Sequence, residues 1–425
     1  MAVSTTAIST GALGGYPEND AGDPCAKKPP PPPELPAGWV EDADWSCTCP
    51  LYVPGSKDVM PKPIEWGPCP PLPNGIECKA MVTDWSDADS PINIGDLQFD
   101  LNPDGTAVLG FRRIMATTAL DLVADIDGPV RMAILRARAK DKPNGCYIIT
   151  QSVNEGRYLY GAFGNDLNDK QTRDEGAIGG WIEDPKPTIL TRFVNRADFS
   201  FGWAAGATWI ARQSPYFVFS ALSWDGSKEI FITSPATDPG GYRAHSAFVS
   251  GRAIFWHTGG PDFHGINVWD AENGARPFIR WVKDGTKEAA AFGTDGKDMV
   301  WAYSKGPVLG QVDSISVMAS PYTIDPAKLK PRRLRSHPYD TIGNEFFKVG
   351  CGYAVHPWYD GTGVGTMVIR IADGSAWTVP HTPEFKYHTP IGVTCDDVFI
   401  LGHIGGRWDI ARVRIDSLGP AIPPD

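Results

Sequence analysis

One stretch of the chain, residues 241–282, alternates four short β-branched and aromatic runs with turns of small or polar residues. The runs predict strands at His245–Val249, Arg252–Thr258, Phe263–Trp269 and Arg276–Val282. The turns between them read Ser-Gly, Gly-Gly-Pro-Asp and Asp-Ala-Glu-Asn-Gly. Four antiparallel strands in about forty residues is the size of one unit of a repeat array.

The same pattern returns roughly every 45 residues along the rest of the chain. Second strands read RAIFWHT, DMVWAYS, YAVHPWY and VFILGHI in successive units, and third-to-fourth turns read SWDGS, DAENGA and ADGSA. A pair of packed β-sandwiches is the alternative explanation. The spacing favours seven units, at residues 97–137, 146–193, 198–233, 241–282, 288–334, 344–379 and 387–415.

Over residues 79–418 this repeat resembles that of bacterial β-propellers in general. The resemblance implies an all-β fold, a seven-bladed β-propeller. The seventh unit has only three strands before the chain ends in GPAIPPD, and Lys79–Trp85 (KAMVTDW) can supply the missing outer strand. The ring is therefore expected to be closed by an N-terminal strand. No WD dipeptide at the usual site, kelch glycine set or S-x-D-x-G-x-x-W box is present, so the resemblance transfers no site residue.

The segment before the repeats, residues 1–78, is an irregular arm rich in proline and cysteine. Lys27–Pro36 (KKPPPPPELP) predicts a polyproline II rod, which either tethers the domain or acts as a spacer. The expected domains are thus the arm, a propeller at residues 79–420 and a short tail at residues 421–425.

Charge and hydropathy limit the partners. The net charge of −11 argues against nucleic acid and anionic membranes, because both need a basic surface. No apolar run is long enough for a transmembrane helix. The first twenty residues do not form an intact signal peptide, so either the chain is cytosolic or an export signal has been removed.

The cysteines favour export to an extracellular, cell-surface or periplasmic location. Five of the eight precede residue 79, in a segment too rich in proline to form a core, and this suits disulfides in an oxidising compartment. No C-x-x-C pair supports the alternative of metal-bound thiols. Because five is odd, we expect Cys351 or Cys395 to pair with the arm. The candidate disulfide residues are Cys25, Cys47, Cys49, Cys69, Cys78, Cys351 and Cys395.

The histidines are expected on one face of the propeller. In an antiparallel unit, the start of the first strand and the finish of the second lie at the same end. His245 and His388 lie near such starts, and His257, His356 and His403 lie near such finishes. The remaining three fall in connections at that end, so all eight are predicted to lie on this upper face.

Acidic and aromatic residues join the histidines at equivalent positions. Glu288 and Glu345 begin first strands, Tyr303 ends a second strand, and Trp358 lies nearby. Such a set can bind a polar ligand, stack a sugar or hold a divalent cation. Each histidine taken singly can instead satisfy backbone groups at a strand end. Elsewhere, the basic run KPRRLR (Lys330–Arg335) is expected on an outer strand, where Arg333 or Arg335 can reach an anion.

Three functions follow from this reading. The leading one is a non-catalytic, secreted or surface-tethered propeller that binds a small molecule, glycan or protein through its upper face. The alternative is a glycan-active enzyme with His245 or His388 as base and Tyr303 as acid, since some propeller-fold polysaccharide lyases have a similar residue composition on this face. The third is a structural subunit of a surface assembly. The sequence leaves any metal site, the cofactor and the oligomeric state undetermined.

Overall fold

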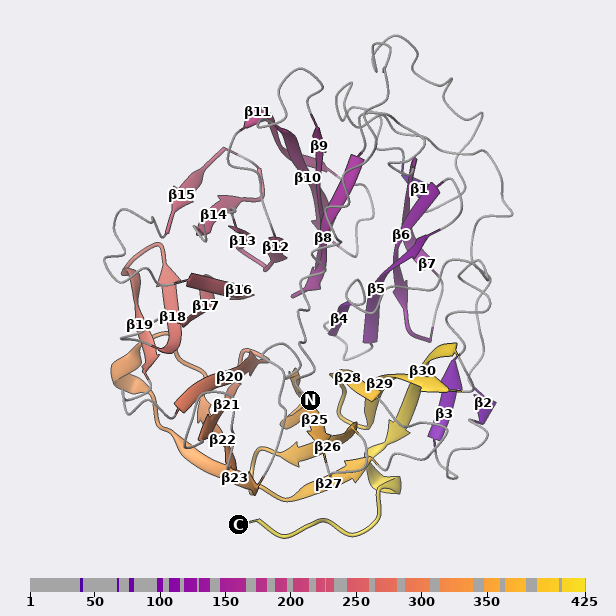
Figure 1. The fold of residues 1–425 in the computed structure, drawn as a ribbon, viewed down its shortest axis with the longest axis vertical. Helices are drawn as coiled ribbons and strands as arrows, with labels where there is room; N and C mark the ends of the chain where they lie inside the picture. The colour runs from indigo at the N-terminus through magenta and orange to yellow at the C-terminus, as the bar shows by residue number, and fades with distance from the viewer. Residues whose placement is uncertain are drawn as a thin grey trace. The chain divides into compact units, whose positions relative to one another are not determined.

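The fold is known from a computed structural model of the chain. The structure describes residues 39–40, 67–68, 76–79, 98–101, 107–114, 118–127, 130–137, 146–165, 173–181, 188–196, 202–213, 219–225, 227–232, 243–259, 264–280, 287–305, 314–338, 348–359, 364–379, 388–404 and 407–424. These residues form an all-β fold of seven sheets (Figure 1). The chain divides into two compact units, Met1–Pro63 with Val82–Thr233 and Ile64–Met81 with Ser234–Asp425.

The first unit holds three sheets. The strand orders are β1-β7-β6-β5-β4, β11-β10-β9-β8 and β12-β13-β14-β15. Pairing is antiparallel except for β1 with β7. The strands are β1 (Trp39–Val40), β4 (Gln98–Leu101), β5 (Ala107–Ile114), β6 (Thr118–Asp125), β7 (Val130–Ala137), β8 (Cys146–Asn154), β9 (Arg157–Asn165), β10 (Arg173–Trp181), β11 (Thr188–Arg196), β12 (Gly202–Ala205), β13 (Trp209–Gln213), β14 (Phe219–Ser223) and β15 (Glu229–Phe231).

The second unit holds four sheets, which follow one another in chain order in Figure 1. Three are four-stranded meanders, β16–β19, β20–β23 and β24–β27, and the fourth has the order β2-β3-β30-β29-β28. The elements are β2 (Gly67–Pro68), β3 (Ile76–Lys79), β16 (Arg243–Ser250), β17 (Ala253–Gly259), β18 (His264–Asp270), β19 (Gly274–Arg280), β20 (Lys287–Thr294), β21 (Asp298–Lys305), β22 (Ser314–Pro321), η4 (Pro326–Lys328), β23 (Arg332–Pro338), β24 (Lys348–Gly350), β25 (Tyr353–Tyr359), β26 (Val364–Arg370), β27 (Ala376–Val379), β28 (His388–Val393), β29 (Asp397–Ile404), β30 (Arg407–Arg414) and η5 (Ile415–Ser417).

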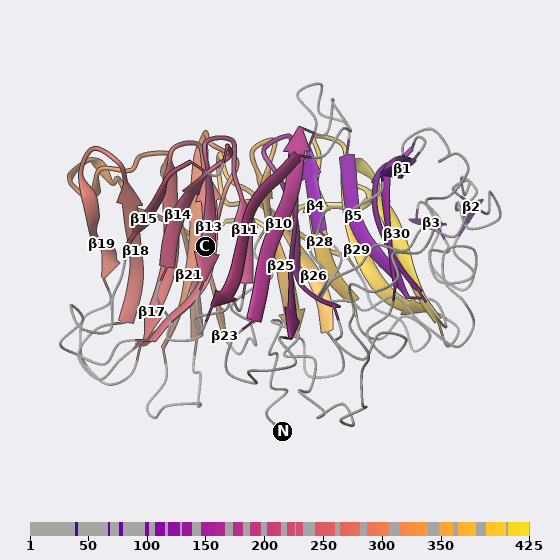
Figure 2. The ribbon, with the colours of Figure 1, turned by 90° about the horizontal axis from the view of Figure 1, so that it is seen from above.

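Alternating side chains bury both faces of the sheets in the second unit. In β21, Met299 and Trp301 pack toward sheet β16–β19, whereas Val300 and Ala302 pack toward sheet β24–β27. The period of two along a strand sends consecutive residues to opposite faces, which explains this division. The core of this unit therefore lies between successive sheets, whose strands are seen lengthwise in Figure 2.

A strand from the N-terminal part of the sequence completes the last sheet. β3 pairs antiparallel with β30, with Ile76 opposite Val413 and Lys79 opposite Ile410. Ile76 is buried in the core cluster of that sheet, and Glu77 forms an ion pair with Arg412. The predicted strand Lys79–Trp85 thus begins three residues after the start of β3. Residues 80–85 lie outside the described residues.

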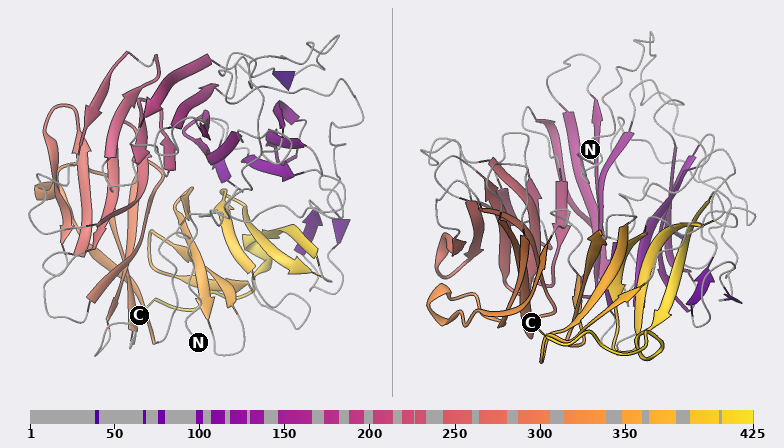
Figure 3. Two further views of the ribbon diagram at one scale, coloured as in Figure 1. Left: turned by 45° about the horizontal axis from the view of Figure 1, so that its top comes forward. Right: turned by 60° about the horizontal axis from the view of Figure 1, so that its bottom comes forward.

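The C-terminal tail lies along the outer side of β27 (Figure 3). Ala376 and Ile422 form an isolated antiparallel bridge with two backbone hydrogen bonds, 3.0 and 2.7 Å long. Arg335 adds a third contact by donating from Nη1 to the Pro423 carbonyl at 2.9 Å. Because these contacts satisfy backbone groups on β27, the tail covers part of that strand's edge.

Candidate functional site

The first two strands of each sheet define two ends, which we call upper and turn ends. The upper end is where the first strand begins, and the turn end is where the first strand turns into the second. Tyr322 aligns two sheets of the second unit at their turn ends: its hydroxyl donates to the Ser250 carbonyl at 3.2 Å, and its N–H donates to the Lys297 carbonyl at 2.8 Å. The upper ends of sheets β16–β19 and β20–β23 must therefore also lie on one side.

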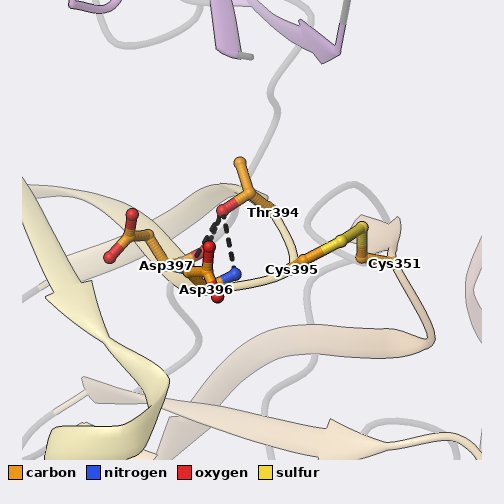
Figure 4. Close-up of a disulfide and its surroundings, with 5 residues drawn as sticks. All are labelled: Cys351, Thr394, Cys395, Asp396 and Asp397. Atoms are coloured by element: carbon orange, nitrogen blue, oxygen red, sulfur yellow. Dashed lines mark hydrogen bonds between the residues drawn. A yellow bond between two sulfur atoms is a disulfide. The ribbon is translucent and has the colours of Figure 1, made fainter. Parts of the chain in front are cut away.

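A disulfide aligns the next pair of sheets in the same way. Cys351, in the turn between β24 and β25, is bonded to Cys395, in the turn between β28 and β29, with their Cα atoms 4.9 Å apart (Figure 4). In the second turn, the Thr394 hydroxyl accepts from the Asp397 N–H at 3.0 Å. The expectation that Cys351 or Cys395 pairs with the arm is therefore wrong, because these two cysteines are bonded to each other.

The remaining cysteine predictions stay open. Cys25, Cys47, Cys49 and Cys69 lie outside the described residues, and Cys78 lies in β3.

Strand register brings three histidines to the upper end of one sheet. His245 lies opposite His257 across β16 and β17, and Gly259, two residues further along β17, lies opposite His264 of β18. Directly opposed residues in antiparallel strands have Cα atoms about 4.5–5.5 Å apart. The predicted ligand residues His245 and His257 are therefore neighbours, and His264 lies beside them.

Corresponding positions of the next sheet carry other predicted residues. Glu288 lies opposite Ser304, and Tyr303 lies opposite Ala289, both near the upper end of sheet β20–β23. His337 lies opposite Ile315 at that end. Glu345 and His381 lie outside the described residues.

The last sheet carries two histidines at its upper end. His388 begins β28 opposite Gly402, and His403 near the finish of β29 lies opposite Trp408. His356 differs, since it occupies the middle of β25, opposite Met367. Register thus places six histidines of the second unit at upper ends: His245, His257, His264, His337, His388 and His403.

His388 joins two sheets. Its side chain is only 1% exposed, and its Nδ1 shares a 2.8 Å hydrogen bond with the Thr366 hydroxyl of β26. A Cβ on the neighbouring Gly365 would make an ordinary 3.8 Å contact with the His388 ring but a tight 3.3 Å contact with the Val379 carbonyl, so glycine avoids crowding against β27. His388 therefore contributes to packing between sheets, a role that the sequence did not reveal.

His356 and Trp358 also belong to the interior. His356 is fully buried and its Nδ1 lies 2.7 Å from the Pro357 carbonyl, which can only accept the bond. Trp358 is half-buried and packs against the core between sheets β20–β23 and β24–β27. His356 therefore presents no surface to a ligand, whereas Trp358 presents only part of its side chain.

In the first unit, the turn between β8 and β9 contacts both neighbouring sheets. The Gly156 N–H donates to Asp100 Oδ2 of β4 at 2.8 Å, and Glu155 Oε2 accepts from the Ala207 N–H at 2.7 Å. Glu155 has φ of 52°, a left-handed conformation that costs energy for a residue with a side chain. The contacts that it makes offset this cost.

An aromatic stack lies next to that turn. The Arg157 guanidinium lies 3.3 Å from the ring centre of Trp181 and 4.4 Å from that of Trp224. Trp224 donates from Nε1 to the Gly206 carbonyl at 2.8 Å, which fixes its ring. Trp181 is 46% exposed. Sequence reasoning missed this stack, because nothing local links tryptophans 43 positions apart.

Within the described residues, no group of three or more His, Cys, Asp or Glu could hold a metal ion. In the same part of the chain, no helix is both long and apolar enough to cross a membrane.

Comparisons with known proteins show the fold. No family model matches the sequence, and no curated protein matches it. Oligogalacturonate lyase from Vibrio parahaemolyticus is similar in structure, with a TM-score of 0.51 at 9% identity over 83% of this chain and 97% of the other. An oligogalacturonate lyase in complex with manganese has a TM-score of 0.50 at 11% identity, over 84% and 96%.

A third similar structure is the β-propeller domain of the Trilobed protease from Pyrococcus furiosus. It has a TM-score of 0.47 at 7% identity, over 79% of this chain and 95% of that domain. The described residues form an all-β fold, and a β-propeller domain is among the structures that this chain resembles.

Proposed function

We propose that this protein is a non-catalytic β-propeller that binds a ligand or protein partner through the upper ends of the sheets in its second unit. The observation that carries the proposal is the register that makes His245 and His257 direct neighbours, with His264 beside them. Histidine is the residue type that suits such a position, because an imidazole group can both donate and accept hydrogen bonds with a polar ligand.

The ligand set differs from the one that the sequence predicts. It keeps His245, His257, His403 and Glu288, which lie at upper ends. It leaves out His356 and His388, because their side chains are buried, and Trp358, because its half-buried side chain packs against the core. A divalent cation remains one ligand that histidine and carboxylate could share.

The proposal includes a closed ring and an exported protein. The seven sheets would be seven blades, with β3 as the outer strand that closes the ring against β30. Export to an extracellular, cell-surface or periplasmic location is supported by the Cys351–Cys395 bond, since disulfides persist in oxidising compartments.

The experiment is a binding screen on the full chain, using a glycan array and calorimetric titrations with Mn²⁺ and Zn²⁺. The variant His245→Ala/His257→Ala should lose binding to whichever probe the wild type binds. Arg252→Ala is the matched control, because Arg252 is an exposed residue at the turn end of the same sheet. Equal binding by all three proteins would contradict the proposal.

The second candidate is a glycan-active enzyme, favoured by the structural likeness to two oligogalacturonate lyases. His245 would act as base and Tyr303 as acid; His388 is not retained as base because it is buried. Incubation with oligogalacturonates distinguishes the two functions. Growing ultraviolet absorbance from an unsaturated product, absent with His245→Ala and with Tyr303→Phe, would favour the enzyme over the binding protein.

A further inference from the structure

The sheet β20–β23 has an unusually long connection before its outer strand. Residues 322–331 join β22 to β23, whereas residues 271–273 and 371–375 make the equivalent connections in the sheets before and after it. Three to five residues are therefore enough to join the third strand of a sheet to the fourth. The additional residues are therefore not needed to form the sheet.

This connection has a defined structure. Asp325 caps the short helix η4 by accepting from the Ala327 N–H at 3.0 Å, and Lys330 donates from its backbone to Ser320 Oγ at 3.0 Å. Arg276 donates to the Ile324 carbonyl at 2.8 Å. Ile324 and Leu329 pack against the core between sheets β16–β19 and β20–β23. The backbone is thus held in place from several sides.

The exposed side chains on and just after this connection are mostly positively charged. Lys328, Lys330, Arg332 and Arg333 are all exposed, and we call them the basic loop. The Lys328 ammonium lies 3.5 Å from Asp325, the one carboxylate between residues 325 and 333. Outside that segment, Asp298 and Asp295 interact electrostatically with each other, and Asp298 with Arg332 and Lys297. With these neighbours included, five cations stand against three carboxylates, which still leaves a local positive excess on a chain of net charge −11.

Arg333 and Arg335 divide the basic run between two roles. Arg335 is buried and donates to the Pro423 carbonyl, so it serves packing rather than recognition. Arg333 is exposed on β23, the outermost strand of its sheet. The sequence predicts that Arg333 or Arg335 can reach an anion, and of these two only Arg333 is exposed.

We propose that the basic loop binds an acidic polysaccharide. Lys330 comes two residues before β23, which begins with Arg332 and Arg333, so these cations follow one another along the chain and form a line rather than a pocket. A line of cations suits a linear polyanion, and guanidinium groups pair well with carboxylates.

The rest of the molecule favours a polysaccharide over nucleic acid or a membrane. The overall charge of −11 opposes every polyanion, and it opposes polyphosphates and anionic lipid surfaces most, because these carry the densest charge. The Cys351–Cys395 bond indicates an oxidising compartment, such as the extracellular space or a cell surface. Acidic polysaccharides occur in the same places. This surface is independent of the proposed function, because it borders the turn end and shares no residue with the upper-end set.

The test measures binding of the full chain to polygalacturonate at low and high salt. Lys330→Glu/Arg333→Glu should weaken binding by about tenfold at low salt, because exposed charges contribute modestly and add. Lys228→Glu/Arg414→Glu is the control, since it changes net charge equally at exposed basic residues of two other sheets. The control should stay within about twofold of wild type.

Three results would overturn the inference. One is equal weakening by both double variants, which would indicate net charge alone. Another is wild-type protein that does not bind polygalacturonate, or that binds single-stranded DNA or anionic vesicles more tightly. The last is binding lost in His245→Ala/His257→Ala but kept in Lys330→Glu/Arg333→Glu, which would assign polygalacturonate to the upper ends.

Discussion

Cys351 and Cys395 occupy equivalent turns of two consecutive sheets and are joined by a disulfide across 44 positions of sequence. The bond therefore links repeat to repeat rather than the domain to the N-terminal arm. Cys351 also has φ of 50°, a left-handed conformation in which glycine costs least.

Removing this bond should destabilise the second unit. For Cys351→Ser/Cys395→Ser we expect a loss of about 2–4 kcal/mol, because the unfolded chain regains the entropy of an open loop. Cys351→Gly/Cys395→Ser should lose about 0.5–1 kcal/mol less, since glycine tolerates the left-handed backbone. Denaturant unfolding of the three proteins checks both values. A serine variant as stable as wild type would show that the bond does not constrain this unit.

The buried hydrogen bond between Thr366 and His388 should contribute to the free energy of unfolding, although the sequence predicts His388 on an exposed face. His388→Ala leaves the Thr366 hydroxyl buried without this partner and should cost about 1–3 kcal/mol. Thr366→Val together with His388→Leu removes both polar groups and should cost less than the sum of the single changes. The double-mutant cycle is measured by denaturant unfolding. Additive costs would mean that the two side chains do not interact.

Asp100 should make the first unit less stable as pH rises. Burial raises the pKa of its carboxyl above the ordinary 3.8, and the nearby Glu155 carboxylate adds to the rise, while backbone N–H groups of Gly156, Leu101 and Glu155 oppose it. Because the folded state holds this proton more tightly, its contribution is complete below the unfolded-state pKa. It is lost as pH rises from 3.8 through the raised folded value.

Thermal unfolding of wild type and Asp100→Asn at a series of pH values tests this sign. The amide does not titrate, so the difference in melting temperature between the two proteins should change above pH 3.8 in favour of the variant. A difference that stays constant with pH, or that shifts in favour of wild type, would contradict the assignment.

Ile76 tests the pairing of β3 with the last sheet. Ile76 is 6% exposed within the core of that sheet, although β3 and β30 are far apart in the sequence, with 335 positions between the paired residues Glu77 and Arg412. Ile76→Ala should cost about 2–5 kcal/mol, because it leaves a cavity beside β30. Glu77→Ala, which removes a partly exposed ion pair with Arg412, should cost no more than about 1 kcal/mol. If both substitutions lowered the free energy of unfolding by the same small amount, Ile76 would not be part of the core and the pairing of β3 with β30 would be contradicted.

The strands could be predicted because their patterns are local. The four expected from residues 241–282 match β16–β19 within two residues at each boundary. In contrast, buried His388 shares a hydrogen bond with Thr366 in another sheet, and no local pattern reports that contact. The Cys351–Cys395 pair was missed although a signal existed, since their separation of 44 is close to the repeat length.

The central claim is that the upper ends of the second unit bind a ligand. A glycan array probed with wild type, His245→Ala/His257→Ala and the turn-end control Arg252→Ala tests it most directly. We expect wild type and Arg252→Ala to give the same bound set, and the double histidine variant to lose it while its melting temperature stays near that of wild type. The same bound set for all three proteins would contradict the claim.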